Sequence, residues 1–213
     1  MAELLRKTID EQTLYAVWKI TESVGELRDA IILREAEEAL YQSFVAESRK
    51  KQWLAYRLLI RTLLKPDDFP VEYDQSGKPF LAGSDFHISV THTEDLAAVI
   101  ISRHARVGID IEKIKPRIEK VRDKFLNPEE SASIGQEREL EQLTLTWCAK
   151  EALYQLYGKR DLDFRDHILV EIPPCAGMTF TAEIRYAGKH DKYLLFSEMI
   201  GSFILVYLLD PSI

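Results

Sequence analysis

The chain has 213 residues, of which 46% are hydrophobic, 30% charged and 10% aromatic, an ordinary globular composition that excludes a disordered polymer. Its formal charge of −7 argues against bulk binding to nucleic acid, because such binding depends on the neutralisation of phosphates. The first residues contain no apolar signal core, and no apolar run approaches the roughly 18 residues of a membrane helix, so we expect a cytoplasmic protein that does not enter membranes.

The first half of the chain predicts a strand, a group of helices and two further strands. Patterns rich in β-formers predict strands over 13–20, 86–90 and 96–102. Helical spacing of apolar residues predicts helices between residues 24 and 64, with Pro66 as the stop signal. A turn-rich stretch over 67–83 follows and contains Gly77-Lys78-Pro79.

The second half repeats this order of elements. A strand is expected over 106–112, a helix start at Asn127-Pro128, and a long helix from about Arg138 to Tyr157 that ends at Gly158. The last part of the chain predicts strands over 168–172, 179–186, 192–198 and 202–209. We therefore expect an α+β fold of two pseudo-symmetric lobes packed together, over 1–104 and 105–213.

Two acidic residues share one face of the strand expected over 106–112. Asp110 and Glu112 are two positions apart, and side chains alternate across a strand, so both carboxylates point the same way while isoleucines point the other. Two like charges this close repel each other, shift a pKa upward or hold a cation such as Mg²⁺. A strand with a solvent-facing acidic side is the plain structural alternative.

Three further elements carry groups that suit phosphate chemistry. Lys150-Glu151 lies on the long helix, where adjacent side chains point about 100° apart, so one could reach a phosphate while the other joins a metal site. Thr91-His92-Thr93 follows a strand and offers hydrogen-bond donors. In Gly77-Lys78-Pro79, the glycine lets the backbone approach a ligand closely and the lysine adds a positive charge. Taken singly, these are also a charged helix surface, a loop histidine and a turn.

Together and in this order, the four elements resemble the 4'-phosphopantetheinyl transferase superfamily, above all its larger, surfactin-synthetase-type branch. The family pattern is a G-[IV]-D-x-E strand followed by a helix that reads [FW]-x-x-K-E-[AS]-x-x-K. Here the strand reads Gly108-Ile109-Asp110-Ile111-Glu112, the helix motif begins at Trp147, and Glu151 follows Asp110 by 41 positions. The G-K-P and T-H-T elements match as well, so the resemblance spans residues 45–160.

The resemblance implies a magnesium-dependent transfer of the phosphopantetheine arm of coenzyme A to a serine of a carrier protein, with release of 3',5'-ADP. The family fold is a pseudo-twofold monomer that binds coenzyme A in the cleft between its lobes. By position, Asp110, Glu112 and Glu151 would bind Mg²⁺, or Mn²⁺, which accepts the same oxygen ligands. Glu151 would also take the proton of the serine, directly or through a metal-bound water.

The remaining implied contacts concern the coenzyme A phosphates and the adenine nucleotide. Lys150 and His92 would contact phosphate oxygens as catalytic groups, with Thr91 as a further binding residue. Gly77 and Lys78 would lie beside the adenine nucleotide. The resemblance is looser for the last pair of residues, which would bind the 3'-phosphate: Arg49 and Arg57.

The chain departs from the family pattern at Gln155, where the motif helix usually carries lysine. Glutamine keeps hydrogen bonding but has no positive charge, and Lys159 could compensate only in part. A non-catalytic relative that binds coenzyme A or a carrier protein therefore stays open as an alternative. A different metal-dependent enzyme of nucleotide or phosphate esters is a second alternative, but it leaves the G-K-P and T-H-T elements unexplained.

The partner expected from the resemblance is an acyl, peptidyl or aryl carrier protein. Carrier proteins are acidic, and so is this chain, so the overall charge would not steer the two together. We therefore expect docking through an apolar patch with a few local bases.

Overall fold

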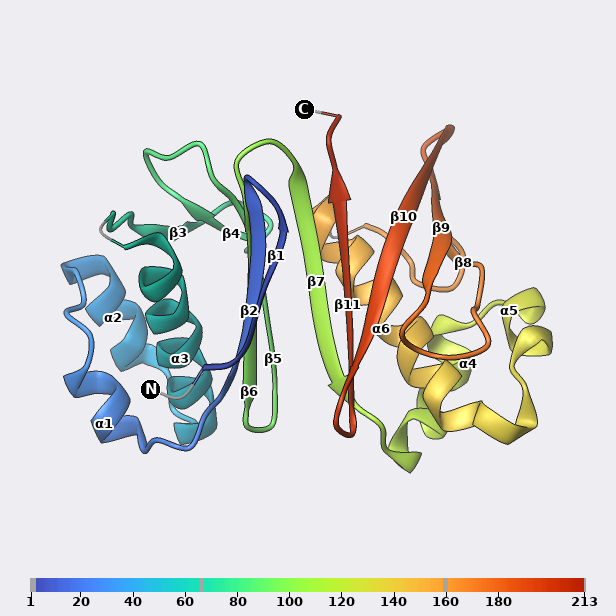
Figure 1. Ribbon diagram of the computed structural model, residues 1–213, viewed down its shortest axis with the longest axis horizontal. Helices are drawn as coiled ribbons and strands as arrows, with labels where there is room; N and C mark the ends of the chain where they lie inside the picture. The colour runs from blue at the N-terminus through green and yellow to red at the C-terminus, as the bar shows by residue number, and fades with distance from the viewer. Residues whose placement is uncertain (1–2, 66, 159–160, 213) are drawn as a thin grey trace.

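The computed structural model describes residues 3–65, 67–158 and 161–212 and has the expected α+β fold. Pro66 and Lys159, for which the sequence suggested a helix stop and a compensating charge, lie outside the described residues. Two antiparallel sheets pack together, each with helices on its outer side, in the order helices, sheet, sheet, helices (Figure 1). Among the described residues, no helix is both long and apolar enough to cross a membrane.

The first half of the chain forms a four-stranded sheet in the order β1-β2-β6-β5, which we call the first sheet. Its strands are β1 (Glu3–Asp10), β2 (Thr13–Lys19), β5 (His87–Thr93) and β6 (Leu96–Ser102). The helices beside it are α1 (Val24–Asp29), α2 (Glu35–Ser43) and α3 (Glu47–Leu64). A short hairpin of β3 (Val71–Tyr73) and β4 (Pro79–Leu81) presents the G-K-P turn.

The second half forms a five-stranded sheet in the order β7-β11-β10-β9-β8, the second sheet. Its strands are β7 (Arg106–Lys113), β8 (Ile168–Val170), β9 (Thr179–Tyr186), β10 (Lys189–Ile200) and β11 (Phe203–Asp210). The helical segments are η1 (Pro116–Val121), α4 (Arg122–Phe125), α5 (Pro128–Ser133), η2 (Gln136–Arg138) and α6 (Glu139–Tyr157). Asn127 caps α5 through a reciprocal capping box, and Gly158 ends α6 in the left-handed conformation, as the sequence predicted.

Three apolar clusters hold the layers together. The first packs α1 to α3 against the outer face of the first sheet, and the second packs α6 against the outer face of the second sheet. The third lies between the sheets, where Tyr15 of β2 meets Tyr207 of β11 with ring centroids 5.2 Å apart. Val107, Ile109 and Ile111 belong to this central cluster, which turns Gly108, Asp110 and Glu112 toward α6.

Several strands differ from the sequence prediction. Strand β5 continues to Thr93, so the T-H-T triplet lies inside the strand and not after it, and β3 and β4 form in the stretch expected as turns. The sequence pattern suggested no strand at β1, because its middle residues Arg6, Lys7 and Thr8 are polar and exposed on the outermost strand of the sheet. Pairing with β2 nevertheless orders this segment. Strand β10 is longer than the predicted 192–198, since its polar start pairs with β9 out to Lys189.

Candidate active site

The close approach of β7 and α6 brings the acidic strand and the acidic helix together. A Cβ atom at Gly108 would lie only 2.1 Å from the backbone oxygen of Ala152, so the helix packs directly on the strand backbone. Glu151 precedes Ala152 on α6 and therefore sits beside the face of β7 that carries Asp110 and Glu112. The three carboxylates named from the sequence thus share one region, and each of them influences another electrostatically.

Asp110 is almost fully buried, with 5% of its surface exposed. One carboxylate oxygen, Oδ1, accepts a hydrogen bond of 2.7 Å from Thr91 Oγ1, whereas the buried Oδ2 has no hydrogen-bond partner among the described residues. Burial, and then the charge of Glu112, raises the pKa of Asp110 well above its ordinary value. Burial and the charge of Glu112 also raise the pKa of Glu151, to about 7.

These carboxylates fit a hard divalent cation. A buried, unpaired carboxylate oxygen beside two further acids is costly without a positive charge, and oxygen donors are what Mg²⁺ and Mn²⁺ accept. Within the described ranges, there is no cluster of three or more Asp, Glu, His or Cys side chains with the geometry of a complete metal site. The donor set therefore suits Mg²⁺, which usually takes only one or two carboxylates and fills its shell with water and substrate phosphates.

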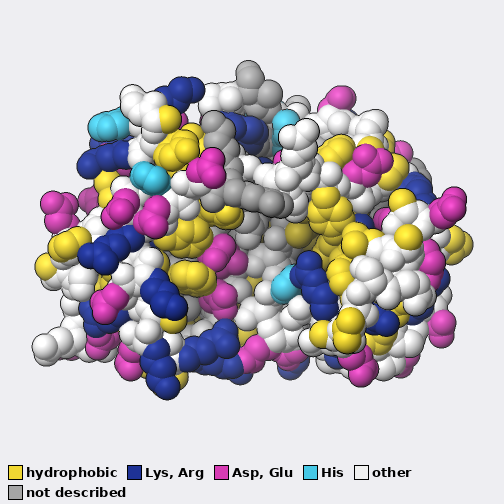
Figure 2. Space-filling view, turned by 180° about the vertical axis from the view of Figure 1, so that it is seen from behind, with side chains coloured by type: hydrophobic (Ala, Val, Ile, Leu, Met, Phe, Trp, Pro, Cys, Tyr) yellow, Lys and Arg dark blue, Asp and Glu magenta, His cyan; other side chains and the backbone are white. Residues whose placement is uncertain are grey.

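Two adjoining cavities lie between the two halves of the molecule, and Thr91, which donates to Asp110, lines the smaller one. One cavity has a volume of about 250 Å³ and the other about 220 Å³, and Gly77, Pro79, Val90 and Gln155 line both. The larger one is also lined by Lys78, Ser89 and Tyr154, and the smaller one by Arg49, Thr91 and His92. The surface is hollowed between the halves, with acidic, basic and histidine side chains around the hollow (Figure 2).

His92 and Arg49 meet at the wall of the smaller cavity. Arg49 Nη1 lies 2.9 Å from His92 Nε2, and a guanidinium can only donate, so Nε2 accepts and the imidazole is neutral. Burial, and then the charge of Arg49, lowers the pKa of His92 accordingly. An exposed arginine and a neutral histidine therefore lie side by side at the smaller cavity. Together they can donate hydrogen bonds to an anion.

The G-K-P turn closes the larger cavity from the first half of the chain. Gly77 has a φ of 86°, which only glycine adopts readily, and the carboxylate of Asp74 accepts hydrogen bonds from the backbone N–H groups of Ser76 and Lys78. The ammonium of Lys78 donates to the carbonyl of Leu156 near the end of α6, at 3.2 Å. Burial, and then the charge of Arg106, lowers the pKa of Lys78.

Gln155 lies at the border of the two cavities, where the family motif places lysine. Its Oε1 accepts a hydrogen bond of 2.5 Å from Ser89 Oγ, and Ser89 Oγ in turn accepts from the backbone N–H of Ile109 at 3.2 Å. With Oε1 engaged by Ser89 and no partner for the amide nitrogen among the described residues, the two N–H donors can face the cavity.

Lys150 does not lie where the sequence placed it. Its side chain is fully buried, and its ammonium donates to Glu130 Oε2 at 2.7 Å and to the carbonyls of Phe164 and Ile168 at 2.8 and 2.6 Å. These three bonds use every N–H of the ammonium. The residue is on the far side of α6 from the cavities, because adjacent helical side chains diverge, so a phosphate contact by Lys150 is not supported.

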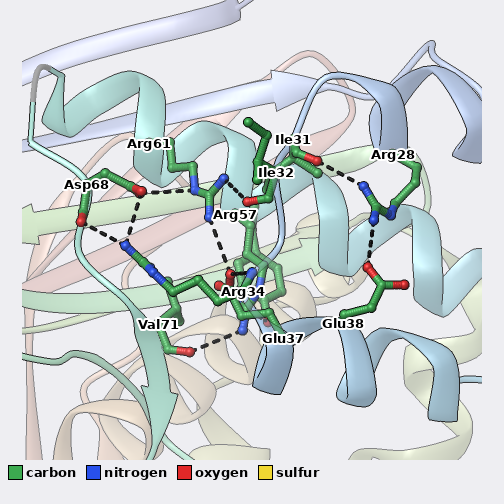
Figure 3. A network of polar contacts seen from close by, with 11 residues as sticks. Arg28, Ile31, Ile32, Arg34, Glu37, Glu38, Arg57, Arg61, Asp68 and Val71 are labelled. Atoms are coloured by element: carbon green, nitrogen blue, oxygen red, sulfur yellow. Dashed lines mark hydrogen bonds and ion pairs between the residues drawn. The ribbon is translucent and has the colours of Figure 1, made fainter.

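Arg57 is also held away from the cavities. Its guanidinium stacks on Trp53, 3.8 Å from the ring centroid, donates to the carbonyl of Val71 and forms an ion pair with Glu37. The pair belongs to a network that links α2, α3 and the chain near Asp68, drawn in Figure 3. With 1% of its surface exposed, Arg57 cannot reach a 3'-phosphate without unpacking α3.

The sequence analysis named Thr93 only as part of the T-H-T triplet, and it missed Ser89 and the pairing of Glu130 with Lys150. Ser89 and Thr93 continue the row that Thr91 begins, and a hydroxyl at every second position of β5 was the available signal. Glu130 was assigned only to the start of α5, although its carboxylate also accepts from Lys150 and from the backbone of Val170. Nothing in the local pattern around Glu130 points to a partner on α6.

Comparisons with known proteins identify the family that this sequence resembles. Residues 106–205 match the model of the 4'-phosphopantetheinyl transferase superfamily. The chain is 32% identical over 144 residues to the 4'-phosphopantetheinyl transferase AcpT of Salmonella typhimurium, covering 65% of this chain and 70% of that protein. It is 25% identical over 160 residues to the 4'-phosphopantetheinyl transferase HetI of a Nostoc species, covering 67% of this chain and 68% of that protein.

Proposed function

The chain belongs to the 4'-phosphopantetheinyl transferase superfamily, and we propose that it moves the phosphopantetheine arm of coenzyme A to a serine of an apo carrier protein and releases 3',5'-ADP. In this reaction a bond forms between the serine oxygen and the β-phosphorus of coenzyme A. The bond from that phosphorus to the bridging oxygen breaks, and the bridging oxygen leaves with the nucleotide. The observation that carries the proposal is the buried Asp110 carboxylate, with one unpartnered oxygen, beside Glu112 and Glu151.

We assign Asp110, Glu112 and Glu151 to a divalent cation, with Mg²⁺ as the first candidate. Bound there, the ion would neutralise phosphate charge and act as a Lewis acid. The protein supplies Asp110 and Glu112 on β7, each held by a hydrogen bond from a threonine of β5, and Glu151 on α6.

Glu151 is the proposed base for the serine proton. In the metal-free protein, burial and the charge of Glu112 raise the pKa of its carboxyl group to about 7, and a cation beside it would favour the ionised form that a base needs. The side chain is only partly buried, so an incoming serine hydroxyl has access to it. When the serine oxygen attacks, its proton passes to the Glu151 carboxylate, directly or through one water.

The two adjoining cavities would hold the nucleotide part of coenzyme A. We propose that Gly77 and Lys78 lie against the nucleotide, and that Arg49 and His92 face its phosphates, whereas the Thr91 hydroxyl is engaged by Asp110. The amide of Gln155 would donate a neutral hydrogen bond at the point where the cavities meet. Lys150 and Arg57 are left out of this set, because the structure uses both side chains for internal pairing.

A third cavity offers a docking surface for an acidic carrier protein. It has a volume of about 320 Å³, includes Glu112, and has an apolar floor of Ile118, Val121 and Trp147. Four basic side chains line the same cavity, Lys113, Lys115, Arg117 and Lys120, and the first two form ion pairs with Glu94. An apolar floor with local bases, beside a site carboxylate, is the surface that an acidic carrier would need to present its serine.

We also propose that the chain works as a monomer of two lobes, 1–104 and 105–213, and that it belongs to the larger branch of the family. The line between the lobes falls in the connection from β6 to β7, where the chain passes from the first sheet to the second.

The experiment is to incubate the protein with coenzyme A, Mg²⁺ and an apo acyl carrier protein, and to weigh the carrier by intact mass spectrometry. A mass gain of one phosphopantetheine arm is expected, and it should be lost with EDTA and with Asp110→Ala. The matched control is Asp67→Ala, which removes an exposed acid of the first half far from the three carboxylates. If coenzyme A binds but fatty-acid, polyketide and peptide carriers all stay unmodified, the non-catalytic alternative replaces this proposal.

A further inference from the structure

A row of hydroxyl groups on β5 reaches across from the first sheet to the second. Ser89, Thr91 and Thr93 occupy every second position of the strand, and each is buried, with 2%, 6% and 7% of its surface exposed. Their side chains therefore share one face of β5, while Ile88 and Val90 pack toward the helices of the first half.

Each hydroxyl of the row meets a group of the site. Thr91 donates to Asp110 Oδ1 at 2.7 Å, and Thr93 donates to Glu112 Oε2 at 3.2 Å. Ser89 donates to Gln155 and accepts from the backbone of Ile109, the residue before Asp110 in β7. The two-residue period of β5 thus matches the two-residue spacing of Asp110 and Glu112.

The direction of these bonds has a chemical consequence. A hydroxyl can donate one hydrogen bond, and a carboxylate can only accept. Each threonine is therefore the donor of its hydrogen bond to the acid. Bonds to ionised acceptors are shorter and stronger than neutral ones, and they fix the plane of the carboxylate. At Asp110 this leaves Oδ2 as the free oxygen, and that is the oxygen without a partner among the described residues.

We propose that Thr91 and Thr93 are positioning residues for the metal site, which hold the carboxylates of Asp110 and Glu112 from the opposite sheet so that one oxygen of each faces the cation. This inference rests on the proposed function. It assigns the two threonines of the T-H-T triplet to the carboxylates, whereas His92, between them, points to the cavity that would hold the phosphates.

The test measures metal affinity as well as activity. Binding of Mn²⁺ to the full chain is measured from the electron paramagnetic resonance signal of free Mn²⁺ in the presence of saturating coenzyme A. A sample with coenzyme A but without protein serves as the blank. Loss of a hydrogen bond to a metal ligand typically weakens metal binding about 10- to 100-fold. We expect Thr91→Val to lower the affinity for Mn²⁺ by this factor and Thr93→Val to lower it less. Thr91→Ser keeps the hydroxyl and should keep the affinity of the wild type.

A matched control is Thr13→Val. Thr13 is a buried threonine of the first sheet whose hydroxyl pairs with Ser102 at 2.8 Å, away from β7. It should lose similar stability in urea but bind Mn²⁺ like the wild type. In turnover, Thr91→Val should raise the Mg²⁺ concentration needed for half-maximal rate, and Thr91→Ser should bring it back, a pattern that a general loss of folding would not give.

Different failures have different meanings. If both valine variants bind Mn²⁺ like the wild type while Asp110→Ala does not, the metal site stands and the positioning role is overturned. If the wild type itself binds no Mn²⁺, or if Asp110→Ala binds it normally, the proposed metal site is wrong and the positioning role falls with it. Should Thr91→Val fail to fold, Thr93→Val, next to the more exposed Glu112, decides the question.

Discussion

The ammonium of Lys150 lies 2.7 Å from Glu130 Oε2, and both side chains are buried. Glu130 also accepts from the backbone N–H of Asn127 and of Val170, so this one pair joins α6 to α5 and to β8. The neighbouring Glu151 leaves α6 in another direction and faces β7. The two adjacent charges of the helix motif therefore have different tasks, since the lysine fixes the helix and the glutamate belongs to the site.

Replacing Lys150 by methionine should lower the stability of the protein rather than its affinity for coenzyme A. The change leaves Glu130 buried without its partner, and breaking a buried ion pair costs about 3 to 5 kcal/mol. Urea unfolding measures the loss, and Lys124→Met, at an exposed position of α4, serves as the control. A stable Lys150→Met that no longer binds coenzyme A would instead restore the phosphate role that the sequence suggested.

The two arginines that the sequence assigned to the 3'-phosphate should behave differently. Arg57→Ala should cost about 3 kcal/mol of unfolding free energy, because it breaks a buried pair with Glu37. Arg49→Ala, at an exposed residue of the cavity wall, should keep the stability but weaken coenzyme A binding about tenfold, the value of one charge-assisted hydrogen bond. Calorimetric titration with coenzyme A and urea unfolding of both variants would separate them, and equal effects on both quantities would contradict the assignment.

Gln155→Lys should tighten the binding of coenzyme A. A lysine ammonium at the border of the two cavities would add a positive charge near the phosphates, and charged hydrogen bonds are about twice as strong as neutral ones. We expect affinity to rise about five- to tenfold at low salt and to fall more steeply as salt is added, because salt screens the new charge. Gln136→Lys, at an exposed position, controls for net charge, and an unchanged salt dependence in Gln155→Lys would place residue 155 outside the phosphate region.

The pKa of Glu151, raised from 4.5 to about 7 by burial and by Glu112, makes stability depend on pH. A raised carboxyl pKa means that the folded state holds its proton more tightly, so this contribution is present below pH 4.5 and is lost as pH rises through 7. In EDTA, the unfolding free energy of the wild type relative to Glu151→Gln should therefore fall by about 2 to 3 kcal/mol between pH 5 and pH 8. A flat difference would contradict the raised pKa, and Mg²⁺ should reduce the slope by favouring the charged carboxylates.

The parts of the site that follow a strand or turn pattern could be predicted from sequence. The common face of Asp110 and Glu112 follows from the alternation of β7, and the turn at Gly77 follows from its residues. The direction of Lys150 could not be predicted, because a helix offers every direction and the choice depends on Glu130, which comes from another element. Arg57 was misplaced for the same kind of reason, since its partner Glu37 lies on α2.

The row on β5 shows a third limit. Hydroxyl side chains suit a phosphate or a carboxylate equally well, and only the packing of β5 on β7 decides between the two. That packing joins residues 19 positions apart in sequence and on different sheets, which a local pattern does not specify.

Within the described residues, strand pairing stays inside each sheet, so the first and second sheets are joined by side chains and by the chain itself. A coenzyme A molecule in the two cavities would touch the first half of the chain and also α6, which packs on the second sheet, so it would act as a reversible cross-link. Ligand at a hundredfold excess over its Kd adds about 2.7 kcal/mol to the stability of the whole molecule. In each turnover, the contact between the two halves would be stabilised when coenzyme A binds and destabilised when the nucleotide leaves. Resistance to heat or protease would therefore differ between the substrate-bound and the product-free protein.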